Sequence, residues 1–127
     1  MTSSALRDRR ILIVEDEYLI ALSLGDALEA AGSVVLGPVP SVDKAIEIIE
    51  SEPQIDAAVV DVNLGGVLAY PVADTLLARN IPFIFTSGYE DKILRARYPQ
   101  IRNCLKPYLF SKMEEALASA MSGSGVS

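Results

Sequence analysis

Five short apolar runs recur along the chain, and each is followed by a segment with the periodicity of an amphipathic helix. The apolar runs span residues 11–14, 33–36, 55–60, 81–85 and 103–105. The helical segments span residues 17–31, 41–51, 71–80, 90–98 and 111–121, with Ser41 and Ser111 as N-caps of the second and the fifth. Strands that alternate with helices favour a parallel sheet covered by helices on both faces, with right-handed crossovers.

The alternation predicts an α/β fold with one doubly wound sheet. For five parallel strands the common order is 2-1-3-4-5, as in flavodoxin-like folds, and ligands then bind beyond the carboxyl ends of strands 1 and 3. A chain of 127 residues fits one domain. We expect this domain to span residues 9–121, with disordered tails at residues 1–8 and 122–127, because small and polar residues dominate both ends.

The composition narrows the chemistry. The net charge is −6, whereas a nucleic-acid-binding surface requires clustered Lys and Arg. The chain has no His and one Cys, which excludes a Ser-His-Asp triad, a Cys-His pair, a His-rich zinc site and an internal disulfide. Every apolar run is much shorter than the roughly 20 residues that span a bilayer. We therefore expect a cytoplasmic protein that binds neither nucleic acid nor membranes.

Polar residues follow four of the apolar runs. These residues are Glu15 and Asp16, Asp61, Thr86 and Ser87, and Lys106. Because the carboxyl ends of parallel strands meet at one edge of a sheet, we expect these side chains to share one crevice. Taken alone, Glu15 and Asp16 could favour a helix N-terminus and Asp61 could cap a turn. Their coincidence at four strand ends favours a common site.

Three carboxylates in one crevice repel one another. At about 4 Å and an effective dielectric constant near 20, each like-charge pair costs roughly 4 kcal/mol. Mg²⁺ would relieve this repulsion, because it prefers oxygen ligands and keeps several waters. Lys106 would pair with Asp61 or with an anion attached to it. The sequence therefore predicts a magnesium site beside a lysine.

This set of residues suits phosphoryl capture by a carboxylate. Asp61 would attack in line, while Mg²⁺ and Lys106 would spread the charge of the transition state. The hydroxyl of Ser87 or Thr86 would then donate to a phosphoryl oxygen. A carboxylate nucleophile is already ionised and needs no general base, so the absence of His is no obstacle.

From residue 11 to residue 121 the chain resembles the receiver domain of two-component response regulators, which has these residue types in this order. The resemblance implies that Asp61 is phosphorylated, that Glu15 and Asp16 form the acidic pair, and that Asp16 contacts the metal directly. It also implies that the main-chain carbonyl of Asn63 is a metal ligand together with these carboxylates. A cis peptide bond before Pro107, common in the family, would direct Lys106 into the site.

Three segments resemble more narrowly the alphaproteobacterial FAT GUY subfamily, which is named after its Phe-Ala-Thr-Gly-Tyr motif. They span residues 61–66, 70–74 and 83–89. In this register Thr86 replaces the alanine and Ser87 replaces the threonine, so we predict Ser87 as the switch hydroxyl and keep Thr86 as the alternative. Tyr89 is the predicted switch aromatic, because the corresponding side chain of receivers often moves inward on phosphorylation.

The resemblance implies a stand-alone receiver that takes its phosphoryl group from a histidine kinase or a histidine phosphotransfer protein. We expect it to signal through phosphorylation-dependent protein interaction or phosphate relay, using the face of helix 4, strand 5 and helix 5. It would not be an enzyme beyond its own phosphorylation and dephosphorylation. One alternative is a small phosphatase or phosphotransferase with an aspartyl-phosphate intermediate, although Asn63 cannot transfer protons. The other is a receiver-like docking module that is never phosphorylated.

Overall fold

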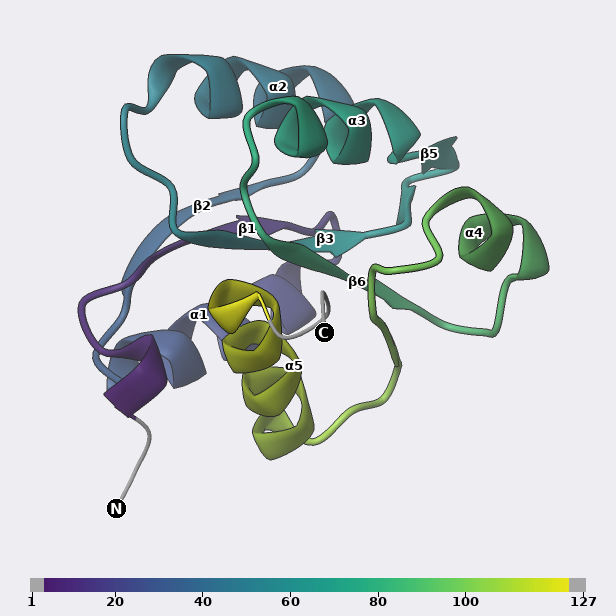
Figure 1. The fold of residues 1–127 in the computed structure, drawn as a ribbon. Helices are drawn as coiled ribbons and strands as arrows, with labels where there is room; N and C mark the ends of the chain where they lie inside the picture. The colour runs from purple at the N-terminus through teal and green to yellow at the C-terminus, as the bar shows by residue number, and fades with distance from the viewer. Residues whose placement is uncertain (1–3, 124–127) are drawn as a thin grey trace.

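A five-stranded parallel sheet lies between two layers of helices (Figure 1). The structure, a computed structural model, describes residues 4–123. The strands of the sheet are β1 (Arg10–Val14), β2 (Val34–Val39), β3 (Ala57–Asp61), β6 (Phe83–Ser87) and β7 (Asn103–Leu105). Their order is β2-β1-β3-β6-β7, and all four pairings are parallel. Counted along these five strands, this is the predicted 2-1-3-4-5 order.

Alternating side chains of the strands divide the core into two halves. The helices are α1 (Tyr18–Ala30), α2 (Val42–Ser51), α3 (Tyr70–Ala78), α4 (Lys92–Arg97) and α5 (Phe110–Ser122). On β1, Ile11 and Ile13 pack with residues of α1 and α5, whereas Leu12 and Val14 pack with residues of α2 and α3. Both faces of the sheet are therefore covered, which explains why its strands read as continuous apolar runs.

Two helix starts test the predicted N-caps. Ser41 caps α2, since its side-chain oxygen accepts a hydrogen bond from the main-chain nitrogen of Lys44 at 3.3 Å. The prediction for Ser111 is wrong, because α5 begins at Phe110 and Leu109 precedes it without a side-chain cap. Phe110 packs against the core between α1 and α5, and this contact places the first turn earlier than the polar pattern indicates.

The domain begins before the expected residue 9. A 3-10 helix, η1 (Ser4–Leu6), precedes β1, and Leu6 is fully buried against the core between α1 and α5. The main-chain carbonyl of Leu6 accepts a hydrogen bond from the hydroxyl of Ser33 at 2.6 Å. One apolar side chain thus anchors a segment that composition assigns to a tail. At the other end α5 includes Ser122, and the rest of the two predicted tails, residues 1–3 and 124–127, lies outside the described residues.

A short hairpin that the sequence does not predict follows β3. Its strands are β4 (Asn63–Leu64) and β5 (Val67–Leu68), which pair antiparallel. Gly65 and Gly66 form the turn with φ values of 63° and 95°, so two successive residues need positive φ, as in the tight turns that favour glycine. The hairpin carries the chain away from Asp61 at the edge of the sheet. None of the helices within residues 4–123 has the length and apolar character needed to cross a bilayer.

Candidate phosphoacceptor and metal site

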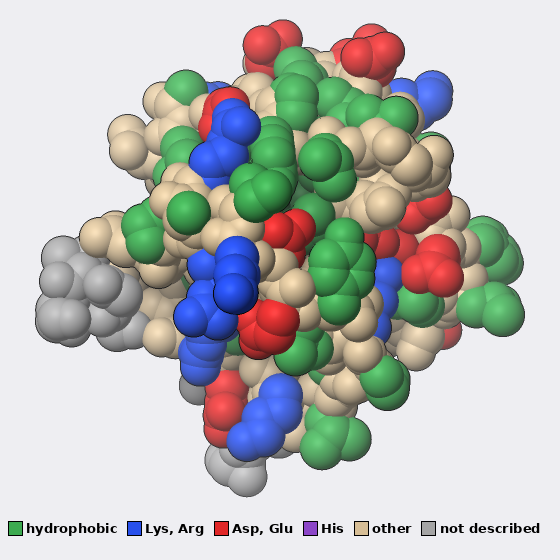
Figure 2. Space-filling view, turned by 90° about the vertical axis from the view of Figure 1, so that its right-hand side faces the viewer, with side chains coloured by type: hydrophobic (Ala, Val, Ile, Leu, Met, Phe, Trp, Pro, Cys, Tyr) green, Lys and Arg blue, Asp and Glu red, His purple; other side chains and the backbone are tan. Residues whose placement is uncertain are grey.

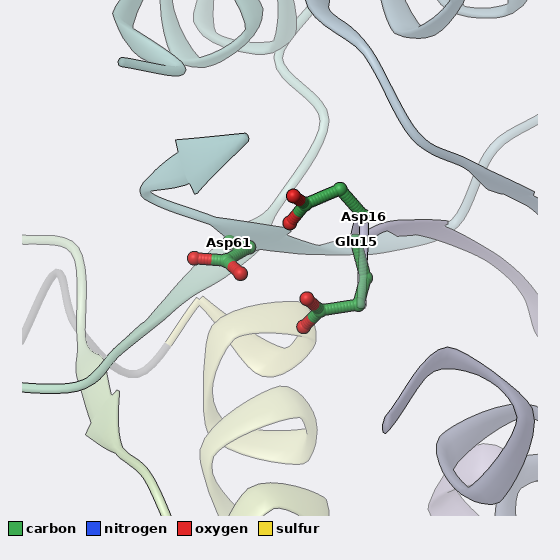
Figure 3. Close-up of side chains that lie close together, drawn as sticks. All are labelled: Glu15, Asp16 and Asp61. Carbon is green, nitrogen blue, oxygen red and sulfur yellow. The ribbon is translucent and has the colours of Figure 1, made fainter. Parts of the chain in front are cut away.

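Three carboxylates converge at the carboxyl edge of the sheet. Glu15 and Asp16 follow β1, and Asp61 is the last residue of β3. Figure 3 shows the three side chains turned toward one another, and one oxygen of each lies within 4.8 Å of the others. Glu15 and Asp61 are each only 5% exposed, whereas Asp16 is exposed. Two buried carboxylates and one accessible carboxylate form an oxygen donor set that suits a hard divalent cation such as Mg²⁺.

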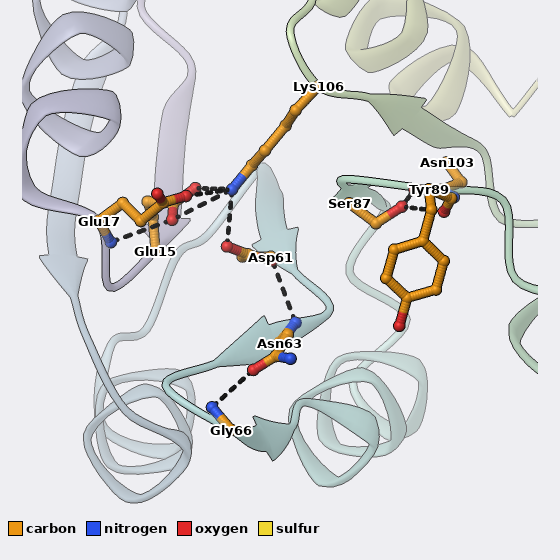
Figure 4. A network of polar contacts seen from close by, with 9 residues as sticks. All are labelled: Glu15, Glu17, Asp61, Asn63, Gly66, Ser87, Tyr89, Asn103 and Lys106. Carbon is orange, nitrogen blue, oxygen red and sulfur yellow. Dashed lines mark hydrogen bonds and ion pairs between the residues drawn. The ribbon is translucent and has the colours of Figure 1, made fainter.

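Lys106 supplies the positive charge in this crevice (Figure 4). Its Nζ lies 2.8 Å from Asp61 Oδ2, 3.2 Å from Glu15 Oε1 and 3.0 Å from Glu17 Oε1. Burial disfavours the ammonium, but hydrogen bonds to Asp61 and Glu17 outweigh this effect and raise the pKa of Lys106 above its ordinary value. The ammonium is therefore permanently charged near neutral pH.

The chain around Lys106 is held in a fixed conformation. The Lys106–Pro107 peptide bond is cis, as the resemblance predicts. The main-chain nitrogen of Lys106 donates to the carbonyl oxygen of Ser87 at 2.7 Å, which ties the end of β7 to the end of β6. The side chain thus starts from an anchored position at the edge of the sheet and extends toward Asp61.

Glu15 is held in an environment that favours its protonated form. Burial raises the pKa of Glu15 to about 7, and the neighbouring carboxylate of Asp61 acts in the same direction. A hydrogen bond from the main-chain nitrogen of Glu17, at 3.1 Å, acts in the opposite direction but is the weaker influence. A proton on Glu15 would relieve part of the repulsion among the three carboxylates when no metal is bound.

Glu17 joins the site although the sequence did not single it out. It precedes α1 and is the third acidic residue in succession after β1. Its carboxylate pairs with Lys106 from the solvent side. The run of three acidic residues is the signal that could have indicated it, but the same run also suits the N-terminus of a helix.

Asn63 lies beside Asp61 and supports both this carboxylate and the hairpin. Its main-chain nitrogen donates to Asp61 Oδ1 at 3.1 Å, and its side-chain oxygen accepts from the main-chain nitrogen of Gly66 at 2.6 Å. The side chain is thus used to hold the turn. Gly65 lies beside the candidate metal ligands, since a Cβ atom there would lie 3.4 Å from Asp16 Oδ2. Metal ligation by the main-chain carbonyl of Asn63 remains a prediction.

Neither candidate hydroxyl is hydrogen-bonded to Asp61. Thr86 is in register with Asp61 on the neighbouring strand and is 1% exposed, and its hydroxyl has no hydrogen-bond partner among residues 4–123. Ser87 lies at the end of β6 and is turned toward the following loop, where its hydroxyl contacts the carbonyl oxygen of Tyr89 at 2.8 Å (Figure 4). The Tyr89 side chain is 60% exposed. The roles of these residues as a switch remain predictions.

A groove opens beside the acidic crevice. It has a volume of about 570 Å³ and lies between α1 and the segment that joins β7 to α5. Its lining residues include Glu17 and Lys106 of the site together with the apolar Leu19, Pro107 and Phe110. The crevice therefore borders an apolar surface that is open to solvent.

Comparisons with known proteins agree on one family. In solved structures the fold matches a response regulator receiver protein from Sinorhizobium medicae WSM419, with a TM-score of 0.81, 26% identity, and coverage of 92% of this chain and 97% of that chain. It also matches SdrG from Sphingomonas melonis Fr1, with a TM-score of 0.78, 40% identity, and coverage of 94% and 99%. The chain belongs to the response regulator receiver family.

Two further comparisons place this receiver among its relatives. It is 27% identical over 114 residues to the phyllosphere-induced regulator PhyR of Methylorubrum extorquens. This match covers 87% of the present chain and 43% of PhyR, so the chain spans less than half the length of this curated relative. The fold is also that of the receiver domain of sensor histidine kinase PA1611 from Pseudomonas aeruginosa PAO1, with a TM-score of 0.77 and 20% identity. The match covers 91% of this chain and 98% of that chain. The structure of the PA1611 domain has a magnesium ion coordinated in its active site cleft. No family model matches the chain.

Proposed function

We propose that this receiver accepts a phosphoryl group on Asp61 from a phosphohistidine donor. The observation that carries the proposal is the position of Asp61, a buried carboxylate with the Lys106 ammonium at 2.8 Å and two further carboxylates close by. A buried carboxylate is costly unless its charge is compensated. Here the Lys106 ammonium compensates the negative charge of Asp61, and a carboxylate can act as a nucleophile.

The donor set also suits Mg²⁺. Glu15, Asp16 and Asp61 would hold the ion through their carboxylates, and Asn63 through its main-chain carbonyl. The ion would neutralise charge on the phosphoryl oxygens during transfer. The magnesium ion in the PA1611 receiver domain supports this choice of metal.

Lys106 and the hydroxyl of Ser87 complete the chemistry. When an Asp61 oxygen attacks the phosphorus atom, a P–O bond forms, the P–N bond breaks, and its electron pair stays with the departing imidazole of the donor. The new aspartyl phosphate carries about −1.5 to −2 charges. Lys106 already lies within hydrogen-bonding distance of Asp61 and would follow the negative charge onto a phosphoryl oxygen, while Ser87 would rotate to donate to another.

The donor would have to dock around the opening of the crevice. Leu19 on α1 is exposed there, and it lines the groove together with Pro107, Phe110 and Lys106 of the site. We therefore propose that a histidine kinase or histidine phosphotransfer protein covers this apolar surface and brings its phosphohistidine to Asp61. Desolvation of the crevice by the docked donor would strengthen the interactions of Lys106.

Signal output is proposed to use the face formed by α4, β7 and α5. Figure 2 shows the α4 end of the molecule, where hydrophobic and basic side chains are exposed next to one another. Tyr89 and Ile93 are exposed there, and Lys92 and Arg95 line a neighbouring hollow. Because Ser87 and Tyr89 connect the crevice to this end, phosphorylation would change the surface offered to a protein target.

The central experiment is phosphorylation by acetyl phosphate with Mg²⁺, followed by intact mass spectrometry. We expect one phosphoryl group on the wild type and none on Asp61→Asn, while Asp43→Asn, a change of an exposed carboxylate in the first turn of α2, keeps the wild-type result. Equal labelling of the Asp61→Asn protein would refute the assignment.

The same reagents separate the two alternatives. Turnover of external phosphate esters would favour a phosphatase, although the Asn63 amide provides no proton to a leaving group. Failure of acetyl phosphate, kinases and phosphotransfer proteins to label the wild type would favour a docking module. A BeF₃-activated conformation of SdrG has been determined in solution. We therefore expect BeF₃ with Mg²⁺ to bind Asp61 of this receiver as a mimic of the phosphoryl group.

A further inference from the structure

The Ser87 hydroxyl is shared between two acceptors in the unphosphorylated protein. It contacts the carbonyl oxygen of Tyr89 at 2.8 Å and the side-chain oxygen of Asn103 at 3.0 Å. Asn103 lies on β7 in register with Phe85, two residues before Ser87 on β6. Residues two apart on a strand share a face of the sheet, so Asn103 and Ser87 are neighbours across the strand pair. Figure 4 shows both side chains turned toward each other and away from Asp61.

Counting donors and acceptors indicates that this arrangement is held weakly. A serine hydroxyl has one proton, so it cannot donate fully to Tyr89 and to Asn103 at the same time. The Asn103 amide nitrogen is buried and has no hydrogen-bond partner within residues 4–123. If the amide rotated by a half turn, its nitrogen would donate to Ser87 while the hydroxyl proton stayed on the Tyr89 carbonyl. In either orientation Asn103 holds the hydroxyl, and in either one a polar atom of its amide is poorly satisfied.

We propose that Asn103 is a positioning residue that holds the Ser87 hydroxyl away from Asp61 and so sets how readily the switch responds to the phosphoryl group. The inference rests on the proposed function, because it assumes that Ser87 turns toward a group on Asp61. The net strength of one hydrogen bond between neutral groups corresponds to about a fivefold change in an equilibrium constant. The contact of Asn103 with Ser87 thus lowers the affinity of the protein for a phosphoryl mimic at Asp61 by about this factor.

Rotation of Ser87 has a consequence for the neighbouring loop. The same hydroxyl satisfies the carbonyl of Tyr89, so its departure leaves this carbonyl without that donor. The main-chain nitrogen of Lys106 meanwhile keeps the carbonyl of Ser87 in place. The side-chain rotation therefore releases the loop beyond Ser87 and leaves the end of β6 fixed. Asn103, which holds Ser87 before the rotation, thus lies between the crevice and the exposed Tyr89.

The inference is tested by measuring the affinity for BeF₃ with Mg²⁺ in Asn103→Val and Asn103→Ala, using tyrosine fluorescence or NMR. Both variants remove the amide, and valine also keeps the preference of this position for a strand. We expect each to bind BeF₃ about fivefold more tightly than the wild type. In a Ser87→Ala background the same Asn103 changes should have no effect, because the hydroxyl that Asn103 holds is absent. A merely structural role would not depend on Ser87.

The resting contact has its own readout, which needs no phosphoryl group. In the metal-free protein, Ser87→Ala should shift the NMR signals of the Asn103 side-chain amide, and unchanged signals would overturn the inference. Wild-type affinity for BeF₃ in both Asn103 variants would also overturn it, yet would leave Asp61 as the phosphoacceptor. A wild type that neither binds BeF₃ nor is labelled by acetyl phosphate would overturn the proposed function and the inference together.

Discussion

Lys106 Nζ lies 2.8 Å from Asp61 Oδ2, and each residue reaches this contact from the carboxyl end of its own strand or the loop that follows it. Glu15 approaches the same ammonium at 3.2 Å. One cation therefore contacts both buried acidic side chains, and the stability of the crevice depends on this cation. This relationship has consequences for folding, for metal binding and for the switch.

Removal of the ammonium should destabilise the metal-free protein. Lys106→Gln leaves Asp61 and Glu15 buried without a cation, so we expect the free energy of unfolding to fall by about 1–3 kcal/mol. Urea denaturation in the presence of a chelator measures this change. Lys112→Gln, on the exposed surface of α5, is the matched control and should unfold like the wild type. A Lys106→Gln protein as stable as that control would contradict the proposed balance of charge.

Mg²⁺ binding should depend on pH through Glu15. Burial raises the pKa of this carboxyl to about 7, so below that pH the metal-free protein carries a proton that must leave before Glu15 can act as a ligand. The affinity for Mg²⁺ should therefore fall up to about tenfold for each pH unit below about 7 and level off above it.

The same proton gives a calorimetric test. Near pH 6.5, Mg²⁺ titrations in two buffers of different ionisation enthalpy should reveal release of about one proton. Glu15→Gln should abolish the release, and Glu17→Gln should retain it, because Glu17 is largely exposed. Equal heats in both buffers for the wild type would count against a protonated Glu15. In the absence of metal, the raised pKa also means that the contribution of Glu15 to stability is lost as the pH rises from about 4.5 to 7.

Alanine substitutions at the two glycines of the hairpin should distinguish an effect of backbone strain from an effect on the candidate metal ligands. Both have positive φ, so Gly65→Ala and Gly66→Ala should each lower the free energy of unfolding by about 1–2 kcal/mol. A Cβ atom on Gly65 would lie in van der Waals contact with Asp16 Oδ2 at 3.4 Å, whereas one on Gly66 would meet no atom within 4 Å. Mg²⁺ titration should show a weaker affinity for Gly65→Ala alone. Equal Mg²⁺ affinities of the two variants would show that the added contact at Gly65 does not disturb Asp16.

Thr86 and Ser87 can be told apart by their hydroxyls. Thr86→Val keeps the shape of the side chain and removes a buried hydroxyl that has no hydrogen-bond partner among residues 4–123, so the free energy of unfolding should rise by about 1 kcal/mol. BeF₃ affinity should stay unchanged in this variant and fall several-fold in Ser87→Ala. Loss of BeF₃ binding in Thr86→Val, with wild-type binding in Ser87→Ala, would transfer the switch role to Thr86.

Much of this architecture could be predicted because it follows from periodicity. Continuous apolar runs identify strands buried on both faces, and parallel strands place their polar ends at one edge, so Asp61 and Lys106 could be brought together before any contact was known. The cis bond before Pro107 followed from the family resemblance. These features depend on chain order and residue type, which are both visible in the sequence.

Other features depend on single contacts that no pattern specifies. Leu6 anchors the N-terminal segment by filling one place in the core, and Phe110 shifts the start of α5 in the same way. The ion pair of Glu17 requires the particular approach of Lys106 from the loop after β7. The contact between Asn103 and Ser87 depends on the register of β6 and β7, which becomes known only when the sheet is assembled.

The claim that Asp61 is the phosphoacceptor is tested most directly by locating the phosphoryl group within the chain. After phosphorylation from a histidine phosphotransfer protein or acetyl phosphate, reduction with borohydride converts an aspartyl phosphate to homoserine, and peptide mass spectrometry identifies the converted residue. The account predicts homoserine at position 61, with no conversion in the absence of Mg²⁺. Conversion at another aspartate, or a labelled protein with Asp61 unmodified, would contradict it.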